Sequence, residues 1–334
     1  MTIRVVAIGV SHWHSLYDSA YLKQLSAMPD VEMVGMQDDM KHLALHRASV
    51  VGIAAPIFTD YQQMLDEVNP SFVLALGRHD NMAETAGHLL DRQIPFIMEK
   101  PMSFNSKQLA TVVEKARLTS GFAAVPLSMR TSPFFIHVKN LIKKGQYGPL
   151  CHFYQRMNRP TSDRYIAWDS PWMLDPAIAN GGCLRNLGVH ALDTFVDLTG
   201  GSHLIEVTGA QLSWATHSRQ VEDYASILLR TKKGVLGTIE VGNGFPTDGT
   251  DEHTKVAFRE AIISIVGESI ILETSNGILE LPSICDSTSV LRRTLDAAVV
   301  GYPPPVSVED CYKAVRLIDM AYIAAGNPYG TAEV

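Results

Sequence analysis

The chain has 334 residues, of which 46% are hydrophobic and 19% charged, and its formal net charge is −7 at pH 7. This length and composition predict a globular protein of two domains with a sizeable core. The negative charge argues against binding to a nucleic-acid backbone. The sequence has no apolar run near the ~18 residues that cross a bilayer, no recognisable signal peptide and no CxxC pair. We therefore expect a cytoplasmic protein without membrane contacts.

The first 120 residues alternate strand-like and helix-like segments. Residues 3–9 form a continuous apolar run, which is typical of a strand covered on both faces. Further predicted strands are 31–36, 57–58, 72–76 and 94–98, and the predicted helices are 16–28, 41–49, 61–68, 83–91 and 106–119. Strands and helices at this spacing predict βαβ units and a doubly wound parallel sheet. This α/β domain is expected to span residues 1–125.

After residue 125 the pattern changes to runs of strands. The predicted helices are 134–144, 189–198 and 308–325, and the predicted strands are 150–158, 205–215, 224–231, 235–241, 256–266 and 270–274. This pattern predicts an α+β domain with a large, mainly antiparallel open sheet over residues 126–334. One face of such a sheet covers helices and the other could pair subunits, so we expect a homo-oligomer, a dimer or tetramer.

A turn follows the first predicted strand, where dinucleotide-binding domains of the Rossmann type carry G-x-G-x-x-G. The chain has Gly9-Val10-Ser11-His12-Trp13-His14 there, so only Gly9 matches a motif glycine. We expect this turn to contact the cofactor through Gly9, Ser11, His12, Trp13 and His14, with backbone amides near Ser11 approaching phosphate. His12 and His14 also have a spacing seen in metal ligands, but the sequence shows no third ligand nearby, so we expect no metal.

Asp38 comes just past the second predicted strand, 24 residues beyond His14. A carboxylate there would accept hydrogen bonds from both hydroxyls of the adenine ribose. This favours NAD over NADP, because Asp38 and Asp39 would repel a 2′-phosphate, although the nearby Lys41 leaves NADP open. In an alternative interpretation the two aspartates only cap the next helix.

Two later segments carry candidate chemistry. Glu99-Lys100-Pro101 follows the apolar run 94–98, and His190 begins an apolar helix. A lysine at the carboxyl end of a buried strand lies where open α/β sheets bind ligands. Lys100 could stabilise charge on a substrate oxygen, and His190 could accept a hydroxyl proton. The alternatives are a solvated surface lysine and a histidine that caps a helix.

Together these segments resemble the Gfo/Idh/MocA oxidoreductases, the family of glucose–fructose oxidoreductase and inositol dehydrogenase. The resemblance covers nearly the whole chain. It rests on the turn at residues 9–14, Glu99-Lys100-Pro101, Ile142–Gly148, Gly181-Gly182, Asn186–Asp193 and the helix after Val306–Asp310. The resemblance implies that Lys100 and His190 share catalysis, and that Glu99 lies near the nicotinamide ribose or holds Lys100.

The chain departs from the family pattern in three places. Asn186 stands where family members usually carry Asp, and an amide orients a hydroxyl but holds no charge. Residues 77–82 replace the usual Thr-Pro and His, and the turn at residues 9–14 lacks two glycines. We therefore expect an atypical cofactor site.

The expected substrate contacts are Arg130, Arg156, Trp172 and Asn186. Arginines beside aromatic residues suit a polyhydroxylated ring or a small carboxylate. Alternatively, the arginines bind the loop carboxylates Asp163, Asp169 and Asp175.

Three functions remain open at this point. The first is an NAD(P)-dependent oxidoreductase that transfers a hydride between nicotinamide and a secondary alcohol or carbonyl of a sugar, cyclitol or related polyol. The second is a glycosidase or lyase that retains NAD and oxidises its sugar only transiently. The third is a non-catalytic family member with a degraded cofactor turn.

Overall fold

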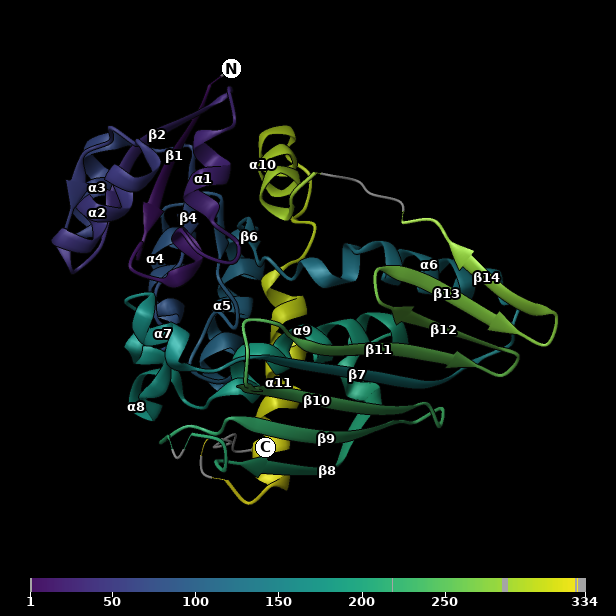
Figure 1. The fold of residues 1–334 in the computed structure, drawn as a ribbon. Coiled ribbons are helices and arrows are strands. Elements are labelled where there is room, and N and C mark those ends of the chain that lie inside the picture. Colours follow the sequence, from purple (N-terminus) through teal and green to yellow (C-terminus); the bar gives the residue numbers. More distant parts are fainter. Residues whose placement is uncertain (1, 218, 284–287, 328, 330–334) are drawn as a thin grey trace. The chain divides into compact units, whose positions relative to one another are not determined.

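The computed structural model describes residues 2–217, 219–283, 288–327 and 329 (Figure 1). The chain forms two compact units, each built from three stretches. The first unit comprises Met1–Pro126, Asp163–Asn180 and Ser289–Glu309, and the second comprises Leu127–Ser162, Gly181–Thr288 and Asp310–Val334. The first stretch ends beside the predicted boundary at residue 125. Residues 163–180 and 289–309, which the sequence prediction assigns to the second domain, pack with the first unit.

The first unit contains a six-stranded parallel sheet with the order β3-β2-β1-β4-β5-β6. Its strands are β1 (Ile3–Ile8), β2 (Val31–Gln37), β3 (Ile57–Phe58), β4 (Phe72–Ala75), β5 (Phe96–Met98) and β6 (Ala123–Ala124). This confirms the predicted doubly wound sheet. The strand order reverses beside β1, and such switch points are where open α/β sheets bind ligands.

Helices connect these strands. They are η1 (Trp13–Ser15), α1 (Tyr21–Ser26), α2 (Lys41–Val51), α3 (Tyr61–Val68), α4 (Met82–Asp91), α5 (Ser106–Thr119), α7 (Asp163–Ala167), η3 (Pro171–Leu174), α8 (Pro176–Ala179) and α10 (Val290–Val300). The predicted helix at 16–28 is wrong in its first part. Asp18 and Ala20 have φ of +49° and +45°, in the left-handed region that interrupts a right-handed helix, so α1 begins only at Tyr21.

The two later stretches are tied to the first by specific contacts. Val125 N donates to Val306 O at 3.0 Å. Arg292 Nη1 on α10 donates to both carboxylate oxygens of Asp30, at 2.7 and 2.8 Å. Leu291 from the same helix is fully buried in the core that covers β1. Helix α10, which the sequence analysis did not predict, is therefore part of the first unit's core.

The second unit contains an eight-stranded sheet with the order β14-β13-β12-β11-β7-β10-β9-β8. Its strands are β7 (Leu150–Pro160), β8 (Ile205–Ser213), β9 (Tyr224–Thr231), β10 (Leu236–Phe245), β11 (Asp251–Phe258), β12 (Ala261–Val266), β13 (Ser269–Thr274) and β14 (Gly277–Leu281). Neighbouring strands are antiparallel except β7 and β10, which confirms the predicted mainly antiparallel sheet. The predicted strand 256–266 is two strands, because the chain turns between Phe258 and Ala261.

The helices of this unit are η2 (Ser128–Thr131), α6 (Pro133–Lys144), α9 (Cys183–Thr199), η4 (Ser202–Leu204) and α11 (Val308–Ala324). Helix α9 packs against β9 and β10 and begins six residues before the predicted start at 189. The buried Glu222 carboxylate accepts hydrogen bonds from Gly182 N at 2.8 Å and Leu184 N at 3.0 Å, which satisfies the first amides of the helix. Among the described residues, no helix combines the length and apolar character needed to cross a membrane.

Candidate cofactor and active site

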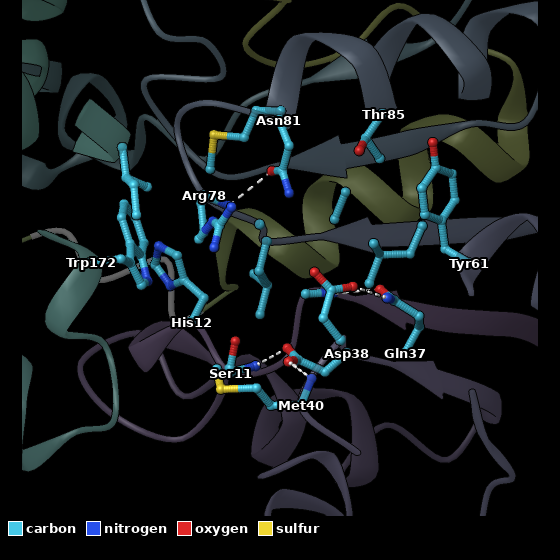
Figure 2. A pocket seen from close by; sticks show the side chains of 18 of the residues that line it. Ser11, His12, Gln37, Asp38, Met40, Tyr61, Arg78, Asn81, Thr85 and Trp172 are labelled. Atoms are coloured by element: carbon cyan, nitrogen blue, oxygen red, sulfur yellow. Dashed lines mark hydrogen bonds between the residues drawn. The ribbon is translucent and has the colours of Figure 1, made fainter. Parts of the chain in front are cut away.

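A cavity of about 490 Å³ lies at the carboxyl ends of β1, β2 and β4 (Figure 2). All its lining residues belong to the first unit. Figure 2 shows His12, Trp172 and Arg78 near one end of the cavity, and Asp38 and Tyr61 toward the other. The cavity therefore occupies the place where a doubly wound sheet binds a dinucleotide.

Gly9 is required by the close approach of two strand ends. Its φ is +69°, and a Cβ at this position would lie 2.4 Å from Gly77 N, just past β4. The only motif glycine that the turn keeps therefore lets β1 and β4 converge beneath the cavity.

We expect Gly9→Ala to lower the free energy of unfolding by about 3 kcal/mol, of which ~1 comes from the left-handed φ and ~2 from overlap with the Gly77 backbone. Gly52→Ala is the matched control, because Gly52 has φ +77° but open space where a Cβ would stand. Urea unfolding of the two variants measures the difference. Equal losses would show that the strand ends separate without cost.

The backbone amides of residues 9–14, the turn after β1, are bonded inside the protein except that of Trp13, which has no such bond among the described residues. Their hydrogen bonds are Gly9 N and Val10 N to Gln37 O (2.9 and 3.3 Å), Ser11 N to Asp38 Oδ2 (2.6 Å), His12 N to Gly9 O (3.1 Å) and His14 N to His12 Nδ1 (3.1 Å). From the sequence, we expect amides near Ser11 to approach phosphate. Because Ser11 N is already paired, a bound pyrophosphate needs other donors.

Asp38 lies at the end of β2 and is only 3% exposed. Its Oδ2 accepts from Ser11 N, and its Oδ1 accepts from Met40 N, at the start of α2, at 3.0 Å. The carboxylate thus links the turn to Met40, the residue before α2, although α2 itself has no side-chain cap. Each oxygen keeps a further acceptor site, and Asp38 lines the cavity, so it can also accept from a ribose.

Glu99 follows β5 and joins the turn to the candidate catalytic lysine. It is 1% exposed, and its Oε1 accepts from His14 Nδ1 at 2.9 Å and Tyr21 OH at 2.8 Å. Its Oε2 accepts from Lys100 N at 3.1 Å. Burial acts to raise the pKa of Glu99, but His14 and Lys100 outweigh it and hold this pKa well below its usual range. Glu99 is therefore ionised and fixes the backbone of Lys100.

Lys100 is buried, with 3% of its surface exposed, so it is no solvated surface lysine. Its Nζ lies 5.9 Å from the ring centre of Trp13, an arrangement that favours the charged ammonium. Lys100 thus places its Nζ over Trp13 and close enough to Glu99 to interact with its charge, at the carboxyl end of the sheet.

His12, His14 and Glu99 offer metal-ligand atoms within 4.8 Å of one another. The sequence shows no third ligand near the two histidines, but the fold brings Glu99 beside them. Burial, together with His14, lowers the pKa of His12 well below its usual value, so its ring is neutral. Because His12 Nδ1 accepts from His14 N, the ring proton is on Nε2, and no free lone pair remains for a metal. We assign this cluster to hydrogen bonding.

Trp172, predicted to contact substrate, lines the cavity of the first unit. It belongs to an aromatic cluster with Trp13 and Tyr165. The His12 ring stacks on Trp13 with centres 3.9 Å apart and lies 5.8 Å from the ring centre of Trp172. Trp172 therefore stands beside the turn that precedes η1.

His190 and Asn186 lie one turn apart on α9 in the second unit. His190 is half-buried, and Asn186 is 2% exposed. Residues four apart on a helix share one face. The structure therefore presents the amide and the imidazole from the same side of α9.

The two candidate substrate arginines bind carboxylates in the second unit. Arg130 makes a two-bond pair with Asp193, with Nε to Oδ2 at 2.9 Å. Arg156 Nη2 donates to Asp251 at 2.9 Å. This favours the network interpretation, with carboxylate partners other than the loop aspartates proposed from sequence.

Sequence reasoning missed several residues that line the cavity: Gln37, Tyr61, Arg78, Asn81 and Thr85. Arg78 and Asn81 lie just past β4, in the segment noted only as a departure from the family pattern. Since β4 neighbours β1, its carboxyl end had to face the same cavity, and that position was the available signal.

The fold and cavity define a Rossmann-type dinucleotide-binding unit joined to a second unit with a large open sheet. Residues 3–125 match the oxidoreductase family with an NAD-binding Rossmann fold, and residues 135–264 match the GFO/IDH/MocA C-terminal domain. The chain belongs to the GFO/IDH/MocA oxidoreductase family.

Solved structures share this fold at low sequence identity. An oxidoreductase from Agrobacterium radiobacter, solved with NAD+, L-tartaric acid and magnesium, is 16% identical, with a TM-score of 0.81 over 98% of this chain and 97% of that one. An aldose-aldose oxidoreductase from Caulobacter crescentus is 15% identical, with a TM-score of 0.81 over 98% of both chains. A levoglucosan dehydrogenase, solved with NADH and levoglucosan, is 17% identical, with the same TM-score and coverage. A comparison with curated protein sequences gave no match.

Proposed function

We propose that this NAD-dependent oxidoreductase transfers a hydride between nicotinamide and a CH–OH carbon of a sugar, cyclitol or related polyol. The observation that carries the proposal is the buried Lys100, fixed by Glu99 at the carboxyl end of β5 in the NAD-binding unit. Two of the structural neighbours named above, the aldose-aldose oxidoreductase and the levoglucosan dehydrogenase, support a sugar-like substrate.

In this mechanism, NAD supplies the hydride acceptor when bound. The Lys100 ammonium donates a hydrogen bond to the substrate oxygen and stabilises the negative charge that develops there. His190 takes the hydroxyl proton, a role that suits an imidazole near neutral pH. Asn186, one helical turn before His190, orients a substrate hydroxyl.

We expect NADH to bind at least about tenfold more tightly than NADPH, because the 2′-phosphate would face the carboxylates of Asp38 and Asp39 on the cavity wall. Tryptophan fluorescence of cofactor-stripped protein measures both affinities, since Trp13 and Trp172 stand beside the turn after β1. A panel of polyols and sugars, followed by NADH absorbance, then tests the reaction.

Each outcome of this titration is informative. Tighter binding of NADPH would refute the role of Asp38. A folded protein that binds neither cofactor would refute the dehydrogenase proposal and favour a non-catalytic member of the family. Turnover of a sugar without net formation of NADH would instead identify the NAD-retaining glycosidase or lyase.

A further inference from the structure

Two buried N–H groups on the cavity wall have no acceptor within the described ranges of the chain. They are Nε2 of His12 and Nε1 of Trp172. Both residues line the cavity and are nearly buried, with 1% and 7% of their surfaces exposed. Figure 2 shows the two rings side by side at one end of the cavity, next to Arg78.

Both groups are donors. The His12 ring is neutral and accepts through Nδ1 from His14 N, so its single proton lies on Nε2. The indole nitrogen of Trp172 can only donate. A buried donor without an acceptor is destabilising, and buried polar groups are usually paired. Two such donors on one wall therefore indicate that a ligand oxygen completes them.

The turn after β1 offers few free backbone N–H groups to a pyrophosphate. In glycine-rich turns the backbone amides bind the pyrophosphate. Here Ser11 N binds Asp38, and the amides of His12 and His14 bind within the turn. Apart from Trp13 N, the turn has no unbonded backbone amide among the described residues, so side chains are the available replacements if a dinucleotide binds in this cavity.

The negative charges of the carboxylates on the same wall are partly balanced by hydrogen-bond donors and a nearby arginine. Asp175 caps α8 by accepting from Ala177 N at 2.9 Å, and Asp169 lies 3.7 Å from the buried Arg47. Arg78 lines the cavity beside His12, and its guanidinium pairs with Asp80 at 3.0 and 3.2 Å, so that carboxylate is compensated as well. An anionic group can therefore approach this end of the cavity.

We propose that His12 Nε2–H and Trp172 Nε1–H bind the pyrophosphate oxygens of the dinucleotide, in place of the amides of a glycine-rich turn. This rests on the proposed function, because it requires an NAD cofactor in the cavity. It explains how a turn with one motif glycine still serves a cofactor site.

The test compares His12→Asn with His12→Gln. Asparagine keeps an oxygen that can accept from His14 N, but its side chain is too short to place a donor where His12 Nε2 lies. The amide nitrogen of glutamine reaches that position. We expect His12→Asn and Trp172→Phe each to weaken NADH and ADP binding about tenfold, with adenosine binding unchanged. His12→Gln should retain most of the wild-type affinity. Isothermal titration calorimetry with NADH, ADP and adenosine gives all three affinities, and thermal unfolding checks that the variants are folded.

The outcomes separate this inference from the proposed function. If the wild-type protein binds neither NADH nor ADP, the cavity is not a cofactor site and the proposed function fails. Wild-type binding with unchanged NADH and ADP affinity in His12→Asn and Trp172→Phe would overturn only the donor assignment. An equal loss of adenosine binding in folded variants would also overturn it, by placing the two rings at the nucleoside end.

Discussion

Replacing Lys100 by Met is expected to lower kcat about 1,000-fold while leaving NADH affinity nearly unchanged. Lys100 is buried, and its backbone amide is held by the ionised Glu99, so its ammonium is preorganised toward developing charge. Removing such a donor or proton-transfer group typically costs 10²- to 10⁴-fold in rate. Methionine keeps the length and apolar character of the side chain, which preserves the packing against Trp13.

The measurement uses the substrate that the polyol panel identifies, with kcat from steady-state kinetics and NADH affinity from fluorescence. Lys107→Met is the matched control, because Lys107 is exposed on α5, and this variant should turn over like the wild type. A Lys100→Met enzyme with wild-type kcat would eliminate Lys100 from the chemistry. A loss of NADH affinity that accounts for the whole effect would place Lys100 in cofactor binding only.

Replacing Arg130 by Met is expected to lower the free energy of unfolding by about 3–5 kcal/mol, because it leaves a buried carboxylate without its counterion. Asp193 is fully buried and paired with Arg130 through two hydrogen bonds. Asp197 and Asp310 each lie 3.7 Å from the same guanidinium. The exposed pair of Arg230 with Glu206 offers the control, and Arg230→Met should cost less than about 1 kcal/mol.

The same variant should have a characteristic pH dependence. Burial raises the pKa of Asp193 to about 6 even though Arg130 acts to lower it, and loss of Arg130 must raise this pKa further. Above the unfolded value near 4, the native variant then binds more protons than the unfolded chain, so its stability falls as pH rises. We expect the deficit against wild type to be larger at pH 8 than at pH 5. A deficit that does not grow between these pH values would show that Asp193 remains charged throughout.

Much of the fold could be predicted because local signals coincide with it. Helices α3 and α5 have their predicted bounds, since Asp60 and Asn105 cap their first amides and residues with left-handed φ end them. The buried parallel strands appear as apolar runs. Strand β14 and helix α10 carry no comparable signal. The early start of α9 depends on Glu222, about 40 residues away in sequence, so no local pattern could reveal it.

Some residues of the candidate site could likewise be predicted from the sequence, and others could not. The position of Lys100 after a buried strand follows from the sequence, because strand ends face the ligand edge. The contact between His14 and Glu99 joins residues 85 positions apart, so no local sequence pattern could place Glu99 beside the two histidines. Trp172 lies in the short helix η3, and the packing of this segment within the first unit has no periodic signal. Its prediction as a site residue came from composition and resemblance, and its place on the cofactor cavity required the structure.

The nucleotide-binding unit is not a continuous piece of chain, and this constrains how it is made. Ser170 Oγ donates to Ser11 O, His79 pairs with Ala179 O, and Arg292 pairs with Asp30. During synthesis the first 126 residues leave the ribosome long before residues 163–180 and 289–309 arrive. The wall that carries Trp172 and the helix that covers β1 are then still missing. The wall of the cofactor pocket is therefore complete only after residue 178 has emerged, and the core that covers β1 gains Leu291 and Leu295 later still.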